Sequence, residues 1–174
     1  MGQALARFEE PLVEIEHREG GVVVLRSTRG LANHPRTIVD WLAHWAAERP
    51  EQTVLAERDA AGAWRRISYS DAFAKVRSLA TALIAAGAGP ERPLAILSEN
   101  SIEQALMTWA AHWAGVPVAP VSPAYSLAAG ALERFRAVVE LVQPWIVFAQ
   151  DGARFARGLE MSHVPSERHI IVSN

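Results

Sequence analysis

Two stretches decide the fold: residues 93–102 (PLAILSENSI) and residues 116–125 (VPVAPVSPAY). Each begins with a short apolar run and passes into a polar or proline-containing loop, and a helix-like segment joins the two. An all-apolar run as short as 94–97 is typical of a strand buried on both faces of a parallel sheet. Two such strands joined through a helix form a βαβ unit with a right-handed crossover. These stretches therefore predict the centre of an open α/β sheet.

The same rhythm continues toward the C-terminus. Apolar runs at 145–149 and 169–172 predict two further strands, and helices are expected over 127–142 and 153–161. This order predicts an α/β protein with a mostly parallel, doubly wound sheet and flanking helices. The sequence ends directly after the last apolar run, whereas a doubly wound fold continues with a loop and a covering helix. We therefore expect the sheet to be incomplete.

Upstream of the sheet, the pattern changes to hairpins and amphipathic helices. Strands at 12–17 and 22–26 around a Gly-Gly pair predict an N-terminal β-hairpin. We expect a helix that begins at Thr37, a hairpin that turns at Asp59–Gly62, and a long helix that begins at Ser70.

The chain is expected to divide into two regions. The first is an N-terminal arm with the hairpin, at residues 1–36, and the second is the sheet domain, at residues 37–174. Pairs of tryptophans spaced four residues apart, at 41/45 and 109/113, each lie on one face of a predicted helix. We expect the six tryptophans to be core or interface residues.

The composition excludes several classes of function. A net charge of −2 leaves no electrostatic footprint for nucleic acid or an anionic membrane. The absence of cysteine excludes disulfides and thiolate chemistry, and the six histidines show no metal-ligand spacing. No apolar segment approaches the roughly 20 residues that span a bilayer, and the N-terminus lacks the apolar core of a signal peptide. We therefore expect a cytoplasmic protein without nucleic-acid, membrane or metal partners.

Candidate binding residues follow the ends of the two central strands, where open α/β sheets bind their ligands. They are Ser98, Glu99, Asn100, Ser122 and Tyr125. An alternative interpretation is structural: Asn100 or Ser101 caps the next helix with Glu99 near its positive end, and the prolines around Ser122 fix a rigid turn. Both interpretations stay open at this level.

No catalytic, cofactor-binding or metal-binding residue is predicted. The glycines at 87 and 89 follow a helix and precede a strand, so they are expected to end the helix rather than to cradle phosphates. The sequence has no Gly-x-x-x-x-Gly-Lys-Ser/Thr motif, and its single lysine, Lys75, lies within a predicted helix.

Several segments together resemble a known enzyme family. They are the TIVDWL helix start at 37–42, the GAGPERPLAILSENS run at 87–101 and the GVPVAPVSPAY run at 115–125. This order resembles the start of the large N-terminal domain of AMP-forming acyl-CoA synthetases, the adenylate-forming superfamily. Within it, the VLRS run ending at Ser27, the WRR strand at 64–66 and the AQDGARFA run at 149–156 are most similar to feruloyl-CoA synthetases.

The resemblance implies a two-step ligation in which a carboxylic acid, here an aromatic or hydroxycinnamic acid, is activated by ATP and transferred to CoA. The family also uses Mg²⁺. It binds its phosphates through motifs rich in Gly, Thr and Lys, and none of these motifs occurs in this sequence. The resemblance thus implies the first subdomain of such a ligase, an N-terminal fragment that is inactive alone and meets ATP, CoA and acid only with a C-terminal part. The alternatives are a stand-alone small-molecule-binding module or a dimerisation module that self-associates through an exposed sheet edge.

Overall fold

The computed structural model describes residues 10–173 of the 174. The chain divides after Pro35 into two compact units, each of which is described by itself. The predicted arm also included residues 1–9, which lie outside the described residues.

The first unit contains a two-stranded antiparallel hairpin, as predicted. Strands β1 (Val13–His17) and β2 (Val23–Ser27) pair so that Ile15 lies opposite Leu25. The turn between them contains Gly20 with φ 75° and Gly21 with φ 78°, a backbone conformation that favours glycine. All the large apolar residues of one face are about half exposed or more; they are Val13, Ile15, Val23 and Leu25. The described part of this unit therefore has no buried core.

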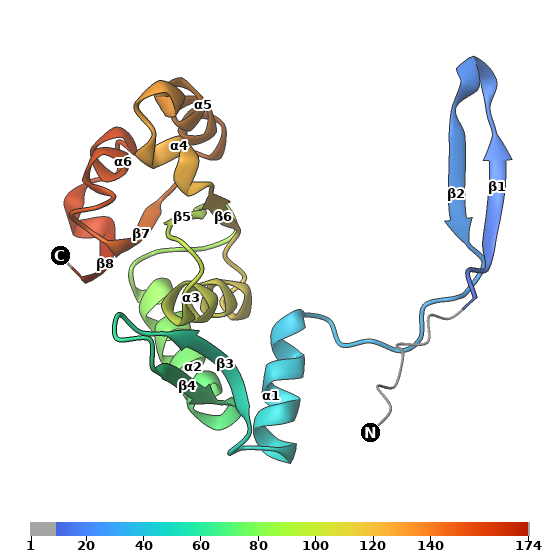
Figure 1. Ribbon diagram of the computed structural model, residues 1–174, viewed down its shortest axis with the longest axis horizontal. Helices are drawn as coiled ribbons and strands as arrows, with labels where there is room; N and C mark the ends of the chain where they lie inside the picture. The colour runs from blue at the N-terminus through green and yellow to red at the C-terminus, as the bar shows by residue number, and fades with distance from the viewer. Residues whose placement is uncertain (1–9, 174) are drawn as a thin grey trace. The chain divides into compact units, whose positions relative to one another are not determined.

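The second unit begins with a helix, a hairpin and a second helix: α1 (Ile38–Glu48), β3 (Thr53–Arg58), β4 (Trp64–Ser68) and α2 (Tyr69–Ala85). The sheet and its crossovers follow as β5 (Leu94–Leu97), α3 (Ile102–Trp113), β6 (Val118–Val121), α4 (Pro123–Leu127), α5 (Leu132–Val142), β7 (Ile146–Asp151), α6 (Ala156–Met161) and β8 (His169–Ser173) (Figure 1). The α/β class that the sequence predicts is therefore confirmed.

The four sheet strands are all parallel and run in the order β6-β5-β7-β8. All four residues of β5 are buried, as the all-apolar run predicts. Alternate residues serve opposite faces: Leu94 and Ile96 pack with α2 and α3, whereas Ala95 and Leu97 pack with α5 and α6. The sheet is thus covered by helices on both sides.

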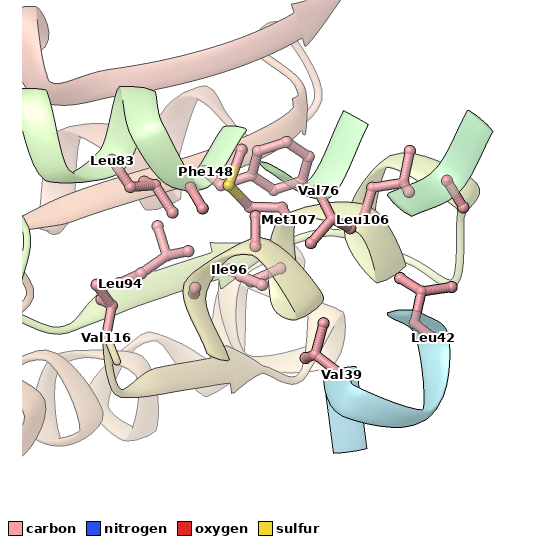
Figure 2. Packing of buried hydrophobic residues seen from close by; sticks show 14 of the residues in the cluster. Val39, Leu42, Val76, Leu83, Leu94, Ile96, Leu106, Met107, Val116 and Phe148 are labelled. Carbon is pink, nitrogen blue, oxygen red and sulfur yellow. The ribbon is translucent and has the colours of Figure 1, made fainter. Parts of the chain in front are cut away.

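The larger core cluster joins the sheet to the helices that precede it. Figure 2 shows Ile96 and Phe148 of the sheet beside Met107 of α3 and Val76 of α2, with Val39 of α1 nearby. Met107, Val76 and Val39 are at most 2% exposed, so this cluster excludes water. Burial of such side chains is the dominant favourable contribution to folding.

Three helix boundaries differ from the prediction. Ser68 rather than Ser70 caps α2, because its hydroxyl accepts a hydrogen bond from the Asp71 amide at 3.2 Å. The helix expected over 127–142 is divided, because Pro123 starts a short helix early and Ala128 has extended backbone angles. The last predicted helix starts at Ala156, because the Asp151 carboxylate holds the preceding turn by accepting from the Arg154 amide at 2.8 Å.

The tryptophan prediction is confirmed only in part: Trp109 and Trp145 pack against the larger core cluster. None of the six is buried: Trp41, Trp64 and Trp113 are 46%, 48% and 41% exposed, and the others are half-buried. Helix α1 instead buries Val39 and Leu42. A separation of four residues shows that two side chains share one helix face, but it does not decide whether that face meets the core.

Candidate functional site

The sheet has a topological switch point between β5 and β7. From β5 the chain passes through α3 to β6 on one side, whereas from β7 it passes through α6 to β8 on the other. Helix α3 packs on one face of the sheet and α6 on the opposite face. Ligands of open α/β sheets bind at such a point, outside the carboxyl ends of the strands. The candidate site is therefore the edge formed by the ends of β5 and β7.

Two side-chain contacts cross this switch point. Leu97 pairs with Ala149, so the next residues, Ser98 and Gln150, are neighbours, and the Ser98 hydroxyl lies 3.0 Å from Gln150 Oε1. One residue further on, Glu99 accepts two hydrogen bonds from the Arg154 guanidinium, at 2.8 and 2.9 Å. Ser98 is 7% exposed, whereas the Glu99 and Arg154 side chains are about half exposed. The β5–α3 loop and the β7–α6 turn are thus tied together.

The residues predicted on the β6 side are arranged differently. Leu97 pairs with Val121, so Ser122 follows at the same edge of the sheet as Ser98 but on the other side of β5. Its carbonyl accepts the Tyr125 amide at 2.9 Å, which closes a turn. The half-buried Tyr125 packs against the smaller core cluster. Among the described residues, no hydrogen bond joins either of them to the Ser98–Asn100 loop.

The loop ends at the N-terminus of α3, where two backbone amides already have hydrogen-bond acceptors. Ser101 caps α3 by accepting from the Gln104 amide at 3.0 Å, so Ser101 rather than Asn100 is the cap. The Ile102 amide donates to Glu57 Oε2 at 2.7 Å, which places a second acceptor from strand β3 at the same helix end. Glu99 points to Arg154 instead of serving this helix end. A phosphate would have to compete with Glu57 for these donors.

Arg65 extends this contact into a charged network. It lies opposite Glu57 in the β3–β4 register and pairs with both Glu57 and Glu103, the latter at 2.7 Å between Nη2 and Oε2. Hydrogen bonding by Arg65 lowers the pKa of Glu103 below its ordinary value, and the two carboxylates raise the pKa of Arg65. The β3–β4 hairpin is therefore fixed to the first turn of α3.

Beside this network lies a groove of about 260 Å³ between β3 and the start of α3. Its lining is mixed apolar and polar, and consists of Leu55, Ala56, Glu57, Asn100, Ser101, Ile102, Gln104 and Ala105. Asn100 is exposed at this groove. Asn100 is therefore the predicted binding residue that lines this groove.

Neither a cluster of metal ligands nor a glycine-rich phosphate loop is seen in the part of the chain that the structure describes. Within residues 10–173, no group of three or more His, Asp or Glu side chains could hold a metal ion. Gly87, with φ 80°, ends α2, and the Ala88 amide donates to the Leu83 carbonyl at 3.0 Å. This is the glycine C-terminal cap that the sequence predicts, in the Schellman arrangement.

Sequence reasoning missed four residues that shape this site. Gln150 and Arg154 follow the predicted strand 145–149, so the same rule of strand ends that selected Ser98 would have found them. Glu57 and Arg65 gave no comparable signal, because their contacts with Ile102 and Glu103 span 45 and 38 residues of chain. Only the folded structure brings them to the loop.

With this geometry established, comparison with known proteins identifies the family. The AMP-binding enzyme family matches residues 42–173, which is most of the chain, so this chain belongs to that family. The predicted membership of the adenylate-forming superfamily is confirmed at this level. The assignment to feruloyl-CoA synthetases within it stays a prediction.

Two relatives illustrate the match. The chain is 29% identical over 143 residues to a Mycobacterium tuberculosis enzyme, 3-[(3aS,4S,7aS)-7a-methyl-1,5-dioxo-octahydro-1H-inden-4-yl]propanoyl:CoA ligase, covering 81% of this chain and 26% of that one. It superimposes on a fatty acyl-adenylate ligase from L. pneumophila, crystallised with acyl adenylate and pyrophosphate, with a TM-score of 0.63 and 17% identity, covering 77% and 23% of the two chains.

A third comparison gives the same picture. The structure of VinN matches with a TM-score of 0.62 at 19% identity, covering 76% of this chain and 31% of VinN. The chain therefore spans roughly a quarter to a third of the length of these relatives. The structural matches show the fold alone. No helix in the described part of the chain combines the length and apolar character needed to cross a membrane.

Proposed function

We propose that this chain is the N-terminal part of a ligase that joins a carboxylic acid to CoA through an acyl-adenylate. The observation that carries the proposal is membership of the AMP-binding enzyme family over residues 42–173. It is supported by the relative that is named a CoA ligase and by the similar fold of a fatty acyl-adenylate ligase. The activity of the whole enzyme is part of this proposal.

The proposed reaction has two displacements. A carboxylate oxygen of the acid attacks the α-phosphorus of ATP, the bond from that phosphorus to the bridging oxygen breaks, and pyrophosphate leaves. The CoA thiolate then attacks the acyl carbon, its bond to the adenylate oxygen breaks, and AMP leaves. Both steps need concentrated positive charge and oriented donors around the phosphates.

The contribution of this chain to that reaction is a scaffold. Its one lysine, Lys75, is exposed on α2, and Arg154 at the sheet edge is paired with Glu99. Residues 10–173 contain no group of three or more His, Asp or Glu side chains that could hold a metal ion. We therefore propose that the chain alone is inactive. ATP, Mg²⁺, CoA and the acid are proposed to bind only when a C-terminal part of the enzyme is also present.

The proposed acid is aromatic, of the hydroxycinnamic class. Support comes from the three segments that are most similar to feruloyl-CoA synthetases, at 24–27, 64–66 and 149–156. The last of these contains Gln150 and Arg154, which cross the switch point. A cytoplasmic location, where ATP and CoA are available, fits this proposal.

Isotope exchange between ATP and pyrophosphate tests the proposal. We expect no ferulate-dependent exchange from the 174-residue chain alone. A protein that carries this chain and is extended to the length of its relatives should exchange with ferulate and less with a fatty acid. Exchange by the chain alone would contradict its role as a scaffold, and an extended protein that activates no carboxylic acid would contradict the ligase function.

A second candidate function is a stand-alone binding module, which the groove beside Asn100 favours. Calorimetric titration of the chain with ATP, CoA and ferulate separately would distinguish the two functions. Tight binding of any one ligand by the chain alone favours the module.

A dimerisation role through the edge strand β8 is a further alternative, because Ile171 and Val172 are 39% and 49% exposed there. It predicts a molar mass by light scattering that rises with concentration.

A further inference from the structure

The loop between β5 and α3 is held from both sides by elements that are distant in sequence. It is only four residues long, Ser98–Ser101, and carries three of the predicted binding residues. On the β7 side it meets Gln150 and Arg154. On the other side, Glu57 of β3 accepts the amide of Ile102, the first residue after the loop. A short loop fixed at both ends has little freedom to rearrange.

We propose that Glu57 and Arg154 are positioning residues that act from opposite sides to fix this loop, so that Asn100 is presented in one orientation at the groove. Neither residue needs to touch a ligand for this role. Preorganisation of this kind improves binding because the ordering of the loop is completed during folding. The inference goes beyond the proposed function, since it concerns the loop itself whichever ligand the groove takes.

The two contacts that fix the loop, Glu57 with Ile102 and Arg154 with Glu99, are unequal in strength. The Glu57 side chain is 25% exposed and is itself held by Arg65, which also pairs with Glu103. Its contact with Ile102 is a charge-assisted hydrogen bond to a backbone amide, which is stronger than a neutral one. Glu99 and Arg154 are 51% and 49% exposed, so water and salt weaken their ion pair. We therefore infer that Glu57 contributes more to the order of the loop than Arg154.

Amide hydrogen exchange of the 174-residue chain, resolved by residue, tests the proposal. In Glu57→Gln, exchange at Ile102 should accelerate by about tenfold. In Arg154→Gln, the NMR order parameters of the Glu99 and Asn100 backbone should fall, and 1 M salt should lower them in the unmodified chain as well. The matched controls are Arg66→Gln, on the neighbouring position of β4, and Arg157→Gln, in the first turn of α6; neither should change exchange or order in this loop.

A charge exchange separates positioning from a general loss of stability. Glu99→Arg combined with Arg154→Glu restores an ion pair across the switch point, so the double variant should recover the loop order that each single variant loses. The proposal is overturned if Glu57→Gln and Arg154→Gln leave the loop unchanged, if the controls change it equally, or if the double variant shows no recovery. These outcomes do not depend on ligase activity, so failure of the ATP–pyrophosphate assay is a separate result.

Discussion

The molecule contains two antiparallel hairpins of similar length whose surroundings differ. In β1–β2, the four apolar residues of one face are between 46% and 65% exposed. In β3–β4, Ile67 is 8% exposed, and Val54 and Leu55 pack against the larger core cluster. An isolated two-stranded hairpin is at best marginally stable in water, whereas one packed on helices is stable. Hence the same local pattern produces an exposed hairpin without a buried core in one case and part of a core in the other.

The largest difference between the hairpins should appear when one isoleucine of each is truncated. Ile67→Ala removes a buried side chain and leaves a cavity, so the free energy of unfolding of the second unit should fall by about 2 to 4 kcal/mol. Ile15 is 59% exposed, and Ile15→Ala should change that free energy by less than about 0.5 kcal/mol. Urea denaturation followed by circular dichroism measures both. Equal losses would mean that the two hairpins are similarly buried in solution.

The turn glycines give a second comparison. Gly62 has φ 83° and its amide donates to the Asp59 carbonyl at 2.9 Å, so Gly62→Ala strains a turn that connects two packed strands. We expect a loss of about 1 kcal/mol in the unfolding free energy of the second unit. Gly20→Ala strains the turn of the first hairpin in the same way, but it should leave the unfolding of the second unit unchanged. A shared loss would show that the two units unfold together.

Removing an ion pair from each hairpin should give a smaller difference in unfolding free energy than the changes above. Arg65 bridges Glu57 and Glu103, which ties its hairpin to α3, and Arg65→Gln should lower the unfolding free energy by about 1 kcal/mol. Arg26 pairs with Glu16 on the open surface of the first hairpin, so Arg26→Gln should have no measurable effect. Thermal melting at low and high salt measures both. A loss from Arg26→Gln as large as that from Arg65→Gln would contradict the difference in tertiary anchoring.

The smallest predicted effect concerns pH. Arg65 lowers the pKa of Glu103, and Arg18 and Arg26 lower that of Glu16, both from an ordinary value of 4.5. A carboxylate with a lowered pKa stabilises the folded state fully above its unfolded pKa, and this contribution is lost as pH falls through the folded pKa. Stability should therefore decline below about pH 4.5 more steeply in the unmodified chain than in Glu103→Gln.

A carboxylate titration by NMR provides the matching local measurement. Both residues should titrate below 4.5, and added salt should raise the pKa of Glu16 more than that of Glu103, because their side chains are 40% and 25% exposed. A midpoint for Glu103 at or above 4.5 would show that the contact with Arg65 does not form in solution.

The sequence predicted much of the architecture because the relevant signals are local. The buried run Leu94–Leu97, the cap at Thr37 and the glycine turn at Gly62 each follow from a few neighbouring residues. The boundary errors also have local causes, such as the helix start at Pro123. The burial of Trp41 and Trp113 was overestimated because helical spacing shows which residues share a face, and burial depends on what packs against that face.

The candidate site was predicted less completely than the fold. Ser98, Glu99 and Asn100 lie at the end of β5 as expected, but the contacts across the switch point come from Gln150 and Arg154. The predicted βαβ unit of β5 and β6 is present, and these strands pair, but the switch point lies on the other side of β5, where β7 pairs with it. Sequence order did not reveal this second neighbour of β5.

By itself, then, the sequence determined the helices and strands, the parallel α/β class and the similarity to an enzyme family. Those properties depend on periodicity and on residues close together in the chain. Tertiary structure alone decided that β7 lies beside β5 and that Glu57 reaches the start of α3. Such contacts join residues about 50 positions apart, and their formation depends on how all the apolar faces are buried at once rather than on any local pattern.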